Sequence, residues 1–233
     1  MCELMAIAYS EPRPAQEVLA LASDLDRLGV TGFGWGMAWL ENGALRGYRH
    51  PTAMADDPVG VDRLREVASA RFLIHLRRPS KLSTVQLADT QPFLDEAGRF
   101  AFCHNGYLDR HQEYRPRYAE RLAGRADSEV GFRVFQDSIA AGVGPAEALS
   151  ATFETMGGRA NFGYLGRDGT LLVYAANPGN AMWVFRLGDA HVASTALHSD
   201  DESLFDLLFR EAVDAERVTG GVGAVGGRTA AAA

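Results

Sequence analysis

The chain has 233 residues, enough for one large domain with its own core, and its 47% hydrophobic and 23% charged residues are typical of a globular protein. Its formal net charge of −7 argues against a general affinity for nucleic acid, and no apolar run approaches the roughly 20 residues of a membrane-spanning helix. Two cysteines, and an N-terminus without a secretory signal pattern, predict a cytoplasmic protein without a disulfide framework.

The first half of the chain is expected to contain two helices and four strands. Pro14 suits the first turn of a helix and Gly29 can end it, with apolar residues at helical spacing between them. Asn42-Gly43 is the strongest short-range signal for a hairpin. The predicted elements are a helix over 14–29, hairpin strands over 33–40 and 44–50, a short helix over 62–70, and strands over 71–76 and 99–106 that a long loop separates.

The second half is expected to alternate helices with hairpins. Asp127 or Ser128 can cap the first helix, and Asp168-Gly169 and Gly188-Asp189 mark hairpin turns. The predicted elements are helices over 127–142 and 145–156, hairpin strands over 161–166 and 170–176, further hairpin strands over 182–187 and 191–197, and a last helix over 201–213.

Strands grouped in hairpins, with helices between them, predict an α+β fold. Antiparallel sheets covered by helices fit this order better than a βαβ doubly wound fold. No internal repeat and no change of composition divides the chain before its end. We therefore expect a single domain over residues 1–217 and a flexible Gly/Ala-rich tail over residues 218–233.

No motif predicts a cofactor or a metal ion. Gly32, Gly34 and Gly36 lack the spacing of a dinucleotide- or phosphate-binding loop, and instead suit a strand that another segment approaches closely. The cysteines and histidines lack the paired spacing of a zinc site. We therefore expect neither a bound cofactor nor a metal.

Five short stretches, each weak alone, gain meaning from their order along the chain. They are MCEL at the N-terminus, IHLRRPS, QPF, FCHNGYLD and RADSEVGF. In this order, with Cys2 directly behind the initiator methionine, they resemble the class II glutamine amidotransferases, a family of N-terminal nucleophile hydrolases. The resemblance covers roughly residues 1–200 and is closest to small stand-alone members, including the γ-glutamyl hydrolase type of the ergothioneine pathway.

The resemblance implies a fold and a set of site residues. The implied fold is a four-layer αββα sandwich of two antiparallel sheets flanked by helices, the N-terminal nucleophile hydrolase fold. Cys2 is the implied nucleophile, and the Asn105 side chain with the Gly106 backbone N–H is the implied oxyanion hole. The implied substrate-binding residues are Arg77 for an α-carboxylate, Asp127 for an α-ammonium, and His104, Trp35 and Gly36.

Amide cleavage explains why these residue types occur together. An unperturbed thiol has a pKa of about 8.5, so Cys2 needs a base, and the α-amine of the same residue, with a pKa of about 7.7–8.0, can accept its proton. This requires removal of Met1, which a small second residue favours. The planar fork of Arg77 matches a carboxylate through two parallel hydrogen bonds.

These roles predict an amidohydrolase that cleaves a γ-glutamyl amide, either glutamine or a γ-glutamyl-capped small metabolite. The cleavage proceeds through a thioester on Cys2 and releases glutamate. One alternative is a glutaminase subunit that delivers ammonia to a separate synthase, and another is a non-catalytic domain that binds a glutamine-like ligand or has a structural role. A synthase or a second copy of the chain is therefore a candidate partner. Gln91 stands where the family often has histidine, which leaves the substrate open.

Overall fold

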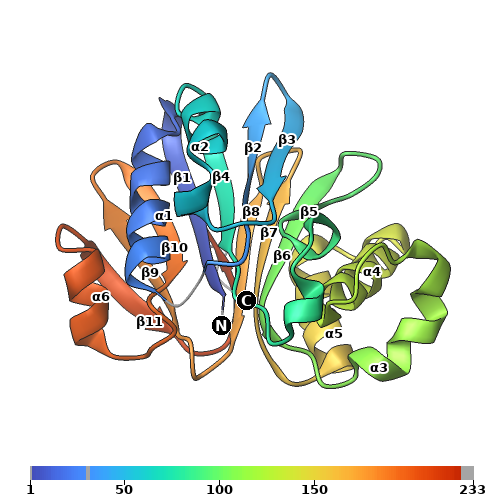
Figure 1. The fold of residues 1–233 in the computed structure, drawn as a ribbon. Helices are drawn as coiled ribbons and strands as arrows, with labels where there is room; N and C mark the ends of the chain where they lie inside the picture. Colours follow the sequence, from blue (N-terminus) through green and yellow to red (C-terminus); the bar gives the residue numbers. More distant parts are fainter. Residues whose placement is uncertain (1, 30–31, 227–233) are drawn as a thin grey trace.

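Two antiparallel β-sheets lie face to face at the centre of the protein, and helices cover their outer faces (Figure 1). The computed structural model describes residues 2–29 and 32–226. In spatial order, the seven-stranded sheet consists of β11 (Val213–Val218), β9 (Met182–Leu187), β10 (Ala190–Thr195), β1 (Glu3–Pro14), β4 (Ala68–Leu76), β2 (Trp35–Glu41) and β3 (Ala44–His50). The five-stranded sheet consists of β12 (Gly221–Ala224), β8 (Leu171–Ala176), β7 (Arg159–Gly166), β6 (Phe100–Tyr107) and β5 (Phe93–Leu94).

The helices form one outer layer on each sheet (Figure 1). The seven-stranded sheet is covered by α1 (Gln16–Leu28), α2 (Pro58–Leu64) and α6 (Glu202–Leu208). The five-stranded sheet is covered by α3 (His111–Tyr114), α4 (Asp127–Ala140) and α5 (Pro145–Met156). Short 3₁₀ segments are η1 (Met54–Asp56), η2 (Leu82–Thr84), η3 (Leu87–Asp89) and η4 (Arg115–Arg121).

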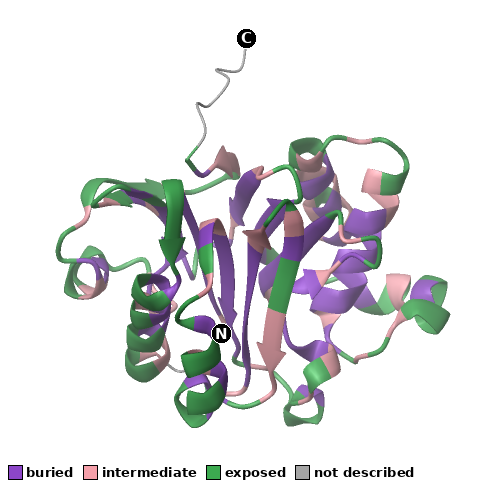
Figure 2. Ribbon diagram, turned by 90° about the horizontal axis from the view of Figure 1, so that it is seen from above, coloured by how far each residue is buried: buried purple, intermediate pink, exposed green. Residues whose placement is uncertain are grey.

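Three hydrophobic cores separate these four layers, and buried residues follow the sheets (Figure 2). The two outer cores join helices to sheets and contain most of the aromatic side chains, including Phe72, Phe135 and Phe162. Burying a side chain of this size contributes about 1.5–3 kcal/mol. The inner core lets the sheets approach because many of its side chains are small, among them Ala6, Ala38, Ala101, Ala175 and Ala193. The predicted α+β sandwich of four layers is confirmed.

The position of β1 determines where the N-terminus lies. β1 is central in its sheet, between β10 and β4, and its register pairs Glu3 with Leu76. Cys2 therefore lies beside the residues that follow β4. The end of β6 approaches from the other sheet, where the Asn105 side chain donates a hydrogen bond to the Cys2 carbonyl oxygen.

Both predicted ends of the second helix are wrong. Helix α2 begins at Pro58, not at residue 62, because the Asp57 side chain accepts a hydrogen bond from the Gly60 N–H at 3.0 Å and Pro58 suits the first turn. Residues 68–70, expected to be helical, belong to β4.

The predicted cap of α4 is also wrong. The N-cap is Ala126, which provides no side-chain cap. The Asp127 side chain instead accepts the backbone N–H of Leu108 at 2.9 Å, and the Ser128 hydroxyl lies 2.9 Å from the His104 ring. These two side chains are used in contacts with the end of β6 and the residues after it.

The C-terminal part differs most from expectation. Helix α6 ends at Leu208, after which β11 pairs with β9 and β12 pairs with β8. The predicted flexible tail is therefore wrong for residues 218–226, and its residues 227–233 lie outside the described residues. The glycine-rich composition hides these strands, because the edges of the two sheets supply their hydrogen-bond partners.

Candidate active site

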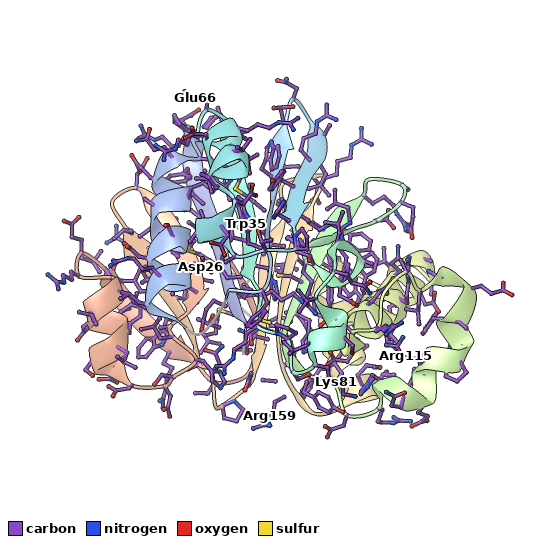
Figure 3. The ribbon with its side chains drawn as sticks, in the orientation of Figure 1. Asp26, Trp35, Glu66, Lys81, Arg115 and Arg159 are labelled. Carbon is purple, nitrogen blue, oxygen red and sulfur yellow. The ribbon has the colours of Figure 1, made fainter. Side chains whose placement is uncertain are left out.

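One cavity of about 300 Å³ opens at the edge where Cys2 lies. Its lining comes from the N-terminus, the loop after β4, the end of β6, the loop before α4 and the start of β7. Figure 3 shows two lining residues, Lys81 and Arg159, at the same lower edge as the N-terminus in Figure 1. The predicted site residues that line this cavity are Cys2, Arg77, His104, Gly106 and Asp127.

The Cys2 thiol lies against the backbone that follows β4. Its Sγ accepts a hydrogen bond from the Arg78 N–H at 3.3 Å and is 3.6 Å from the Arg78 carbonyl oxygen. Burial raises the pKa of the thiol, and the Arg78 N–H and the charge of Arg77 act in the opposite direction. Burial dominates, so Cys2 needs a base to become a thiolate near neutral pH.

Two opposite charges face the cavity from different segments. Arg77 is only 4% exposed and donates one Nη–H to Thr84 Oγ1 at 2.7 Å, while its other Nη has no hydrogen-bond partner among the described residues. An unsatisfied buried donor is costly, and more so when it is charged. The Asp127 carboxylate lines the same cavity. Together they fit a ligand that has both a carboxylate and an ammonium group.

His104 forms an uncharged wall of the cavity. Its backbone N–H donates to Gln91 Oε1 at 2.6 Å, and its Nδ1 is 2.9 Å from Ser128 Oγ. Burial lowers the pKa of the imidazole, although the charge of Asp127 acts against this. The ring is therefore neutral at neutral pH and fixed in orientation.

Asn105 and Gly106 lie at the end of β6, next to Cys2. The Asn105 Nδ2 donates one hydrogen to the Cys2 carbonyl oxygen, and an amide NH₂ has a second hydrogen to donate. Asn105 itself does not line the cavity, whereas Gly106 does. Gly106 has a φ of +145°, and a Cβ there would lie 1.8 Å from the Arg159 carbonyl oxygen. Only glycine fits this position.

Comparison with known proteins identifies the family of this chain. The family model for class II glutamine amidotransferases matches residues 1–218. The chain belongs to this family. Among curated proteins, no sequence matches this chain.

Solved structures share the fold of this chain. It is similar to glutamine phosphoribosylpyrophosphate amidotransferase from B. subtilis complexed with ADP and GMP, with a TM-score of 0.71, 16% identity, and coverage of 96% of this chain and 48% of that chain. It is also similar to a glutamine aminotransferase class-II domain protein from Silicibacter pomeroyi, with a TM-score of 0.57, 19% identity, and coverage of 83% of this chain and 88% of that chain. The chain thus spans about half the length of the B. subtilis enzyme.

Trp35 and Gly36, two of the predicted substrate-binding residues, do not line the cavity. Trp35 is fully buried in the outer core of the seven-stranded sheet and donates its Nε1–H to Asp57 at 3.1 Å. A Cβ at Gly36 would lie 2.3 Å from the Gln91 carbonyl oxygen. This close approach is the one expected of a strand glycine, and the segment that approaches contains Gln91, which does line the cavity.

Sequence reasoning missed several buried polar residues around Cys2. The Asn180 side chain donates to the Cys2 carbonyl oxygen at 3.1 Å, and the Asn161 side chain donates to the Asn180 carbonyl oxygen at 2.7 Å. Glu3 is 1% exposed and accepts a hydrogen bond from the Thr195 hydroxyl, and burial raises its pKa to about 7. No sequence spacing marks such residues, because each is a single polar side chain in a strand or turn.

The second cysteine lies away from the cavity. Cys103 is fully buried in the inner core between the sheets, where burial raises its pKa strongly. Within residues 2–29 and 32–226, no group of three or more His, Cys, Asp or Glu side chains is placed to hold a metal ion. In the same part of the chain, no helix combines the length and the apolar character that crossing a membrane requires.

Proposed function

We propose that this chain hydrolyses a γ-glutamyl amide, either glutamine or a γ-glutamyl-capped small metabolite, and releases glutamate. The observation that carries the proposal is one cavity that Cys2, the buried cation Arg77 and the carboxylate Asp127 line together. A γ-glutamyl group offers an α-carboxylate to Arg77, an α-ammonium to Asp127 and a carbonyl carbon to Cys2. Arg77 can bind the carboxylate through parallel hydrogen bonds.

The first step forms a thioester. Once Met1 has been removed, the α-amine of Cys2 takes the thiol proton, which overcomes the unfavourable effect of burial on the thiol. The thiolate attacks the γ-carbonyl carbon, and its oxygen becomes an oxyanion. The second hydrogen of the Asn105 amide and the Gly106 N–H are the proposed donors to this oxyanion. The C–N bond then breaks, and the α-ammonium of Cys2 returns the proton to the leaving amine.

The second step removes the glutamyl group. The α-amine of Cys2 takes a proton from water, and the hydroxide attacks the thioester carbonyl carbon. The C–S bond breaks, glutamate leaves, and the proton returns to the Cys2 sulfur. His104 and Gln91 also line the cavity, and the His104 backbone N–H donates a hydrogen bond to Gln91 Oε1. Neither side chain transfers a proton in these steps.

Covalent labelling tests this proposal. We expect intact mass spectrometry to show a chain without Met1 that gains one adduct from 6-diazo-5-oxo-L-norleucine, a γ-glutamyl-directed electrophile. The adduct should map to Cys2, disappear in Cys2→Ala, and persist in the matched control Cys103→Ala, because Cys103 is buried between the sheets. A chain that keeps Met1, or labels only at Cys103, would overturn the proposal and favour a non-catalytic binding domain.

A glutaminase subunit for a separate synthase is the second candidate. Three large apolar side chains stand exposed in the loop beside the cavity, where a partner could cover them: Leu82 at 73%, Val85 at 38% and Leu87 at 49% exposure. If the isolated chain releases glutamate and free amine in equal amounts with ordinary turnover, the hydrolase is supported. Negligible turnover that rises when a co-purified synthase is added would support the subunit instead.

A further inference from the structure

The mouth of the Cys2 cavity carries four cations that a glutamyl head group does not need. Arg78 and Lys81 come from the loop after β4, Arg125 from the loop before α4, and Arg159 from the start of β7. All four are exposed, and Asp127 is the only carboxylate among the lining residues. This local excess of positive charge contrasts with the net charge of −7 for the whole chain.

These cations have no ion-pair partner in the described part of the chain. The ion pairs there involve other basic residues. Two buried carboxylates near Arg125 bind backbone instead. Asp89 accepts the N–H groups of Arg125 and Ala126, each at 2.7 Å, and Glu129 accepts those of residues 123 and 124 at 2.8 and 2.7 Å. They fix the loop that presents Arg125 to the cavity.

The cavity has an inner end and a mouth, and Cys2 lies between them. Arg77 is buried, whereas the next residue, Arg78, is exposed, and its backbone N–H contacts the Cys2 sulfur at 3.3 Å. The γ-carbonyl carbon of a substrate has to reach this sulfur. With the glutamyl head group bound at Arg77 and Asp127, the amine on the other side of that carbon extends toward the mouth.

We propose that the amine released from the γ-glutamyl group carries an anionic group, a carboxylate or a phosphate, that Arg78, Lys81, Arg125 and Arg159 bind. The inference rests on the proposed γ-glutamyl hydrolysis. Glutamine releases ammonia and offers these cations nothing, whereas an amino acid or another acidic amine offers a charge at the mouth. Several cations around one anion reinforce one another and attract it from solution, with an effect that salt screens.

Two isosteric substrates separate charge from shape. γ-L-Glutamylglycine and γ-L-glutamylglycinamide differ only in the terminal carboxylate and amide. We expect kcat/KM for the acid to exceed that for the amide by about tenfold at low ionic strength, because several exposed ion pairs add up. The ratio should fall toward one in ~1 M salt, where the Debye length is about 3 Å. The γ-glutamyl derivative of aminomethylphosphonate then shows whether a carboxylate or a phosphate-like group is preferred.

Charge-removal variants assign the effect to this mouth. The double variant Arg125→Gln with Arg159→Gln should lower the acid-to-amide ratio of kcat/KM by about threefold or more, because two of the four cations are gone. Arg63→Gln is the matched control, since Arg63 is an exposed residue of α2 that does not line the cavity. It should leave the ratio unchanged.

The outcomes distinguish this inference from the proposed function. If both substrates release glutamate at equal rates, and Cys2→Ala abolishes the release, the anionic amine is overturned while the hydrolase stands. If no substrate, glutamine included, releases glutamate, the hydrolase is overturned. In that case, calorimetry measures how tightly the Cys2→Ala variant binds γ-L-glutamylglycine and γ-L-glutamylglycinamide. About tenfold tighter binding of the acid supports an anion site at the mouth, and equal binding of the two overturns it.

Discussion

Two hollows in the protein differ in size and in what lines them. The larger, which we call the outer groove, has a volume of about 780 Å³ and lies between α1, α6 and the turn from β9 to β10. Its walls are largely apolar and include Leu21, Leu28, Leu187, Leu207 and Phe209. The Cys2 cavity has less than half this volume, about 300 Å³, but most of the residues that line it are of polar or charged types.

Whether the charged side chains have partners distinguishes the two hollows better than their volumes do. In the outer groove, Asp189 is bound to Arg13 at 2.7 Å and Asp24 to Arg27 at 3.1 Å. Arg77, which lines the Cys2 cavity, has a buried Nη with no hydrogen-bond partner among residues 2–29 and 32–226. A groove arises wherever two helices diverge over a sheet, whereas an unsatisfied buried charge persists only where something compensates for it. The smaller hollow is therefore the better candidate for chemistry.

The largest expected effect tests whether activity belongs to the smaller hollow alone. Asn105→Ala should lower kcat for glutamate release about 100- to 1,000-fold, the usual loss when one oxyanion donor is removed. Leu207→Ala in the outer groove should change kcat by less than about twofold, because Leu207 is 49% exposed and does not line the Cys2 cavity. Steady-state kinetics on both variants, with circular dichroism to confirm folding, measures this. Equal losses of kcat in the two variants would contradict the assignment of activity to the Cys2 cavity alone.

A second prediction concerns the tight packing behind the Cys2 cavity. Gly106→Ala should lower the free energy of unfolding by on the order of 3 kcal/mol, because it combines overpacking against the Arg159 carbonyl with a strained φ. Gly98→Ala, at a positive φ of 65° with nothing within 4 Å of the added Cβ, should cost only about 1 kcal/mol. Urea denaturation of both variants compares them. Similar losses would show that backbone conformation alone makes Gly106 necessary.

The third prediction uses the buried acid beside Cys2. Burial raises the pKa of Glu3 from 4.5 to about 7, so the folded state keeps a proton that the unfolded state releases between these values. The stability that Glu3 contributes is therefore complete below pH 4.5 and is lost as pH rises through 7. Glu3→Gln removes this titration, so its stability relative to the parent should rise by about 3 kcal/mol between about pH 4 and about pH 8.

Urea unfolding at several pH values measures this difference. The control is Glu202→Gln, which makes the same substitution at the exposed start of α6. A difference for Glu3→Gln that stays constant with pH would contradict the burial of a proton at Glu3. It would also weaken the contrast between the Cys2 cavity and the outer groove, because burial of the polar groups around Cys2 would then not destabilise their charged forms.

Much of the fold could be predicted because its signals are local. The Asn42-Gly43 turn fixed one hairpin, and β2 and β3 lie on either side of it as expected. Alternation along a strand placed Cys103 and His104 on opposite faces, and the structure puts the first in the inner core and the second at the cavity. The edge strand β12 could not be predicted, since its partner β8 is distant in sequence.

The sequence by itself determined the family, through its ordered motifs, and an antiparallel α+β fold, through its hairpin signals, because both are properties of the chain alone. The two-sheet sandwich and the candidate residues Cys2, Arg77 and Asp127 came with the resemblance to the family. Tertiary structure decided which of these residues meet. It placed Trp35 in the outer core and not in the cavity lining, and it added Asn180 to the contacts of Cys2. It also brought Arg125 and Arg159 to one mouth from different loops and strands. Such neighbours depend on how the layers pack, and no spacing along the chain records them.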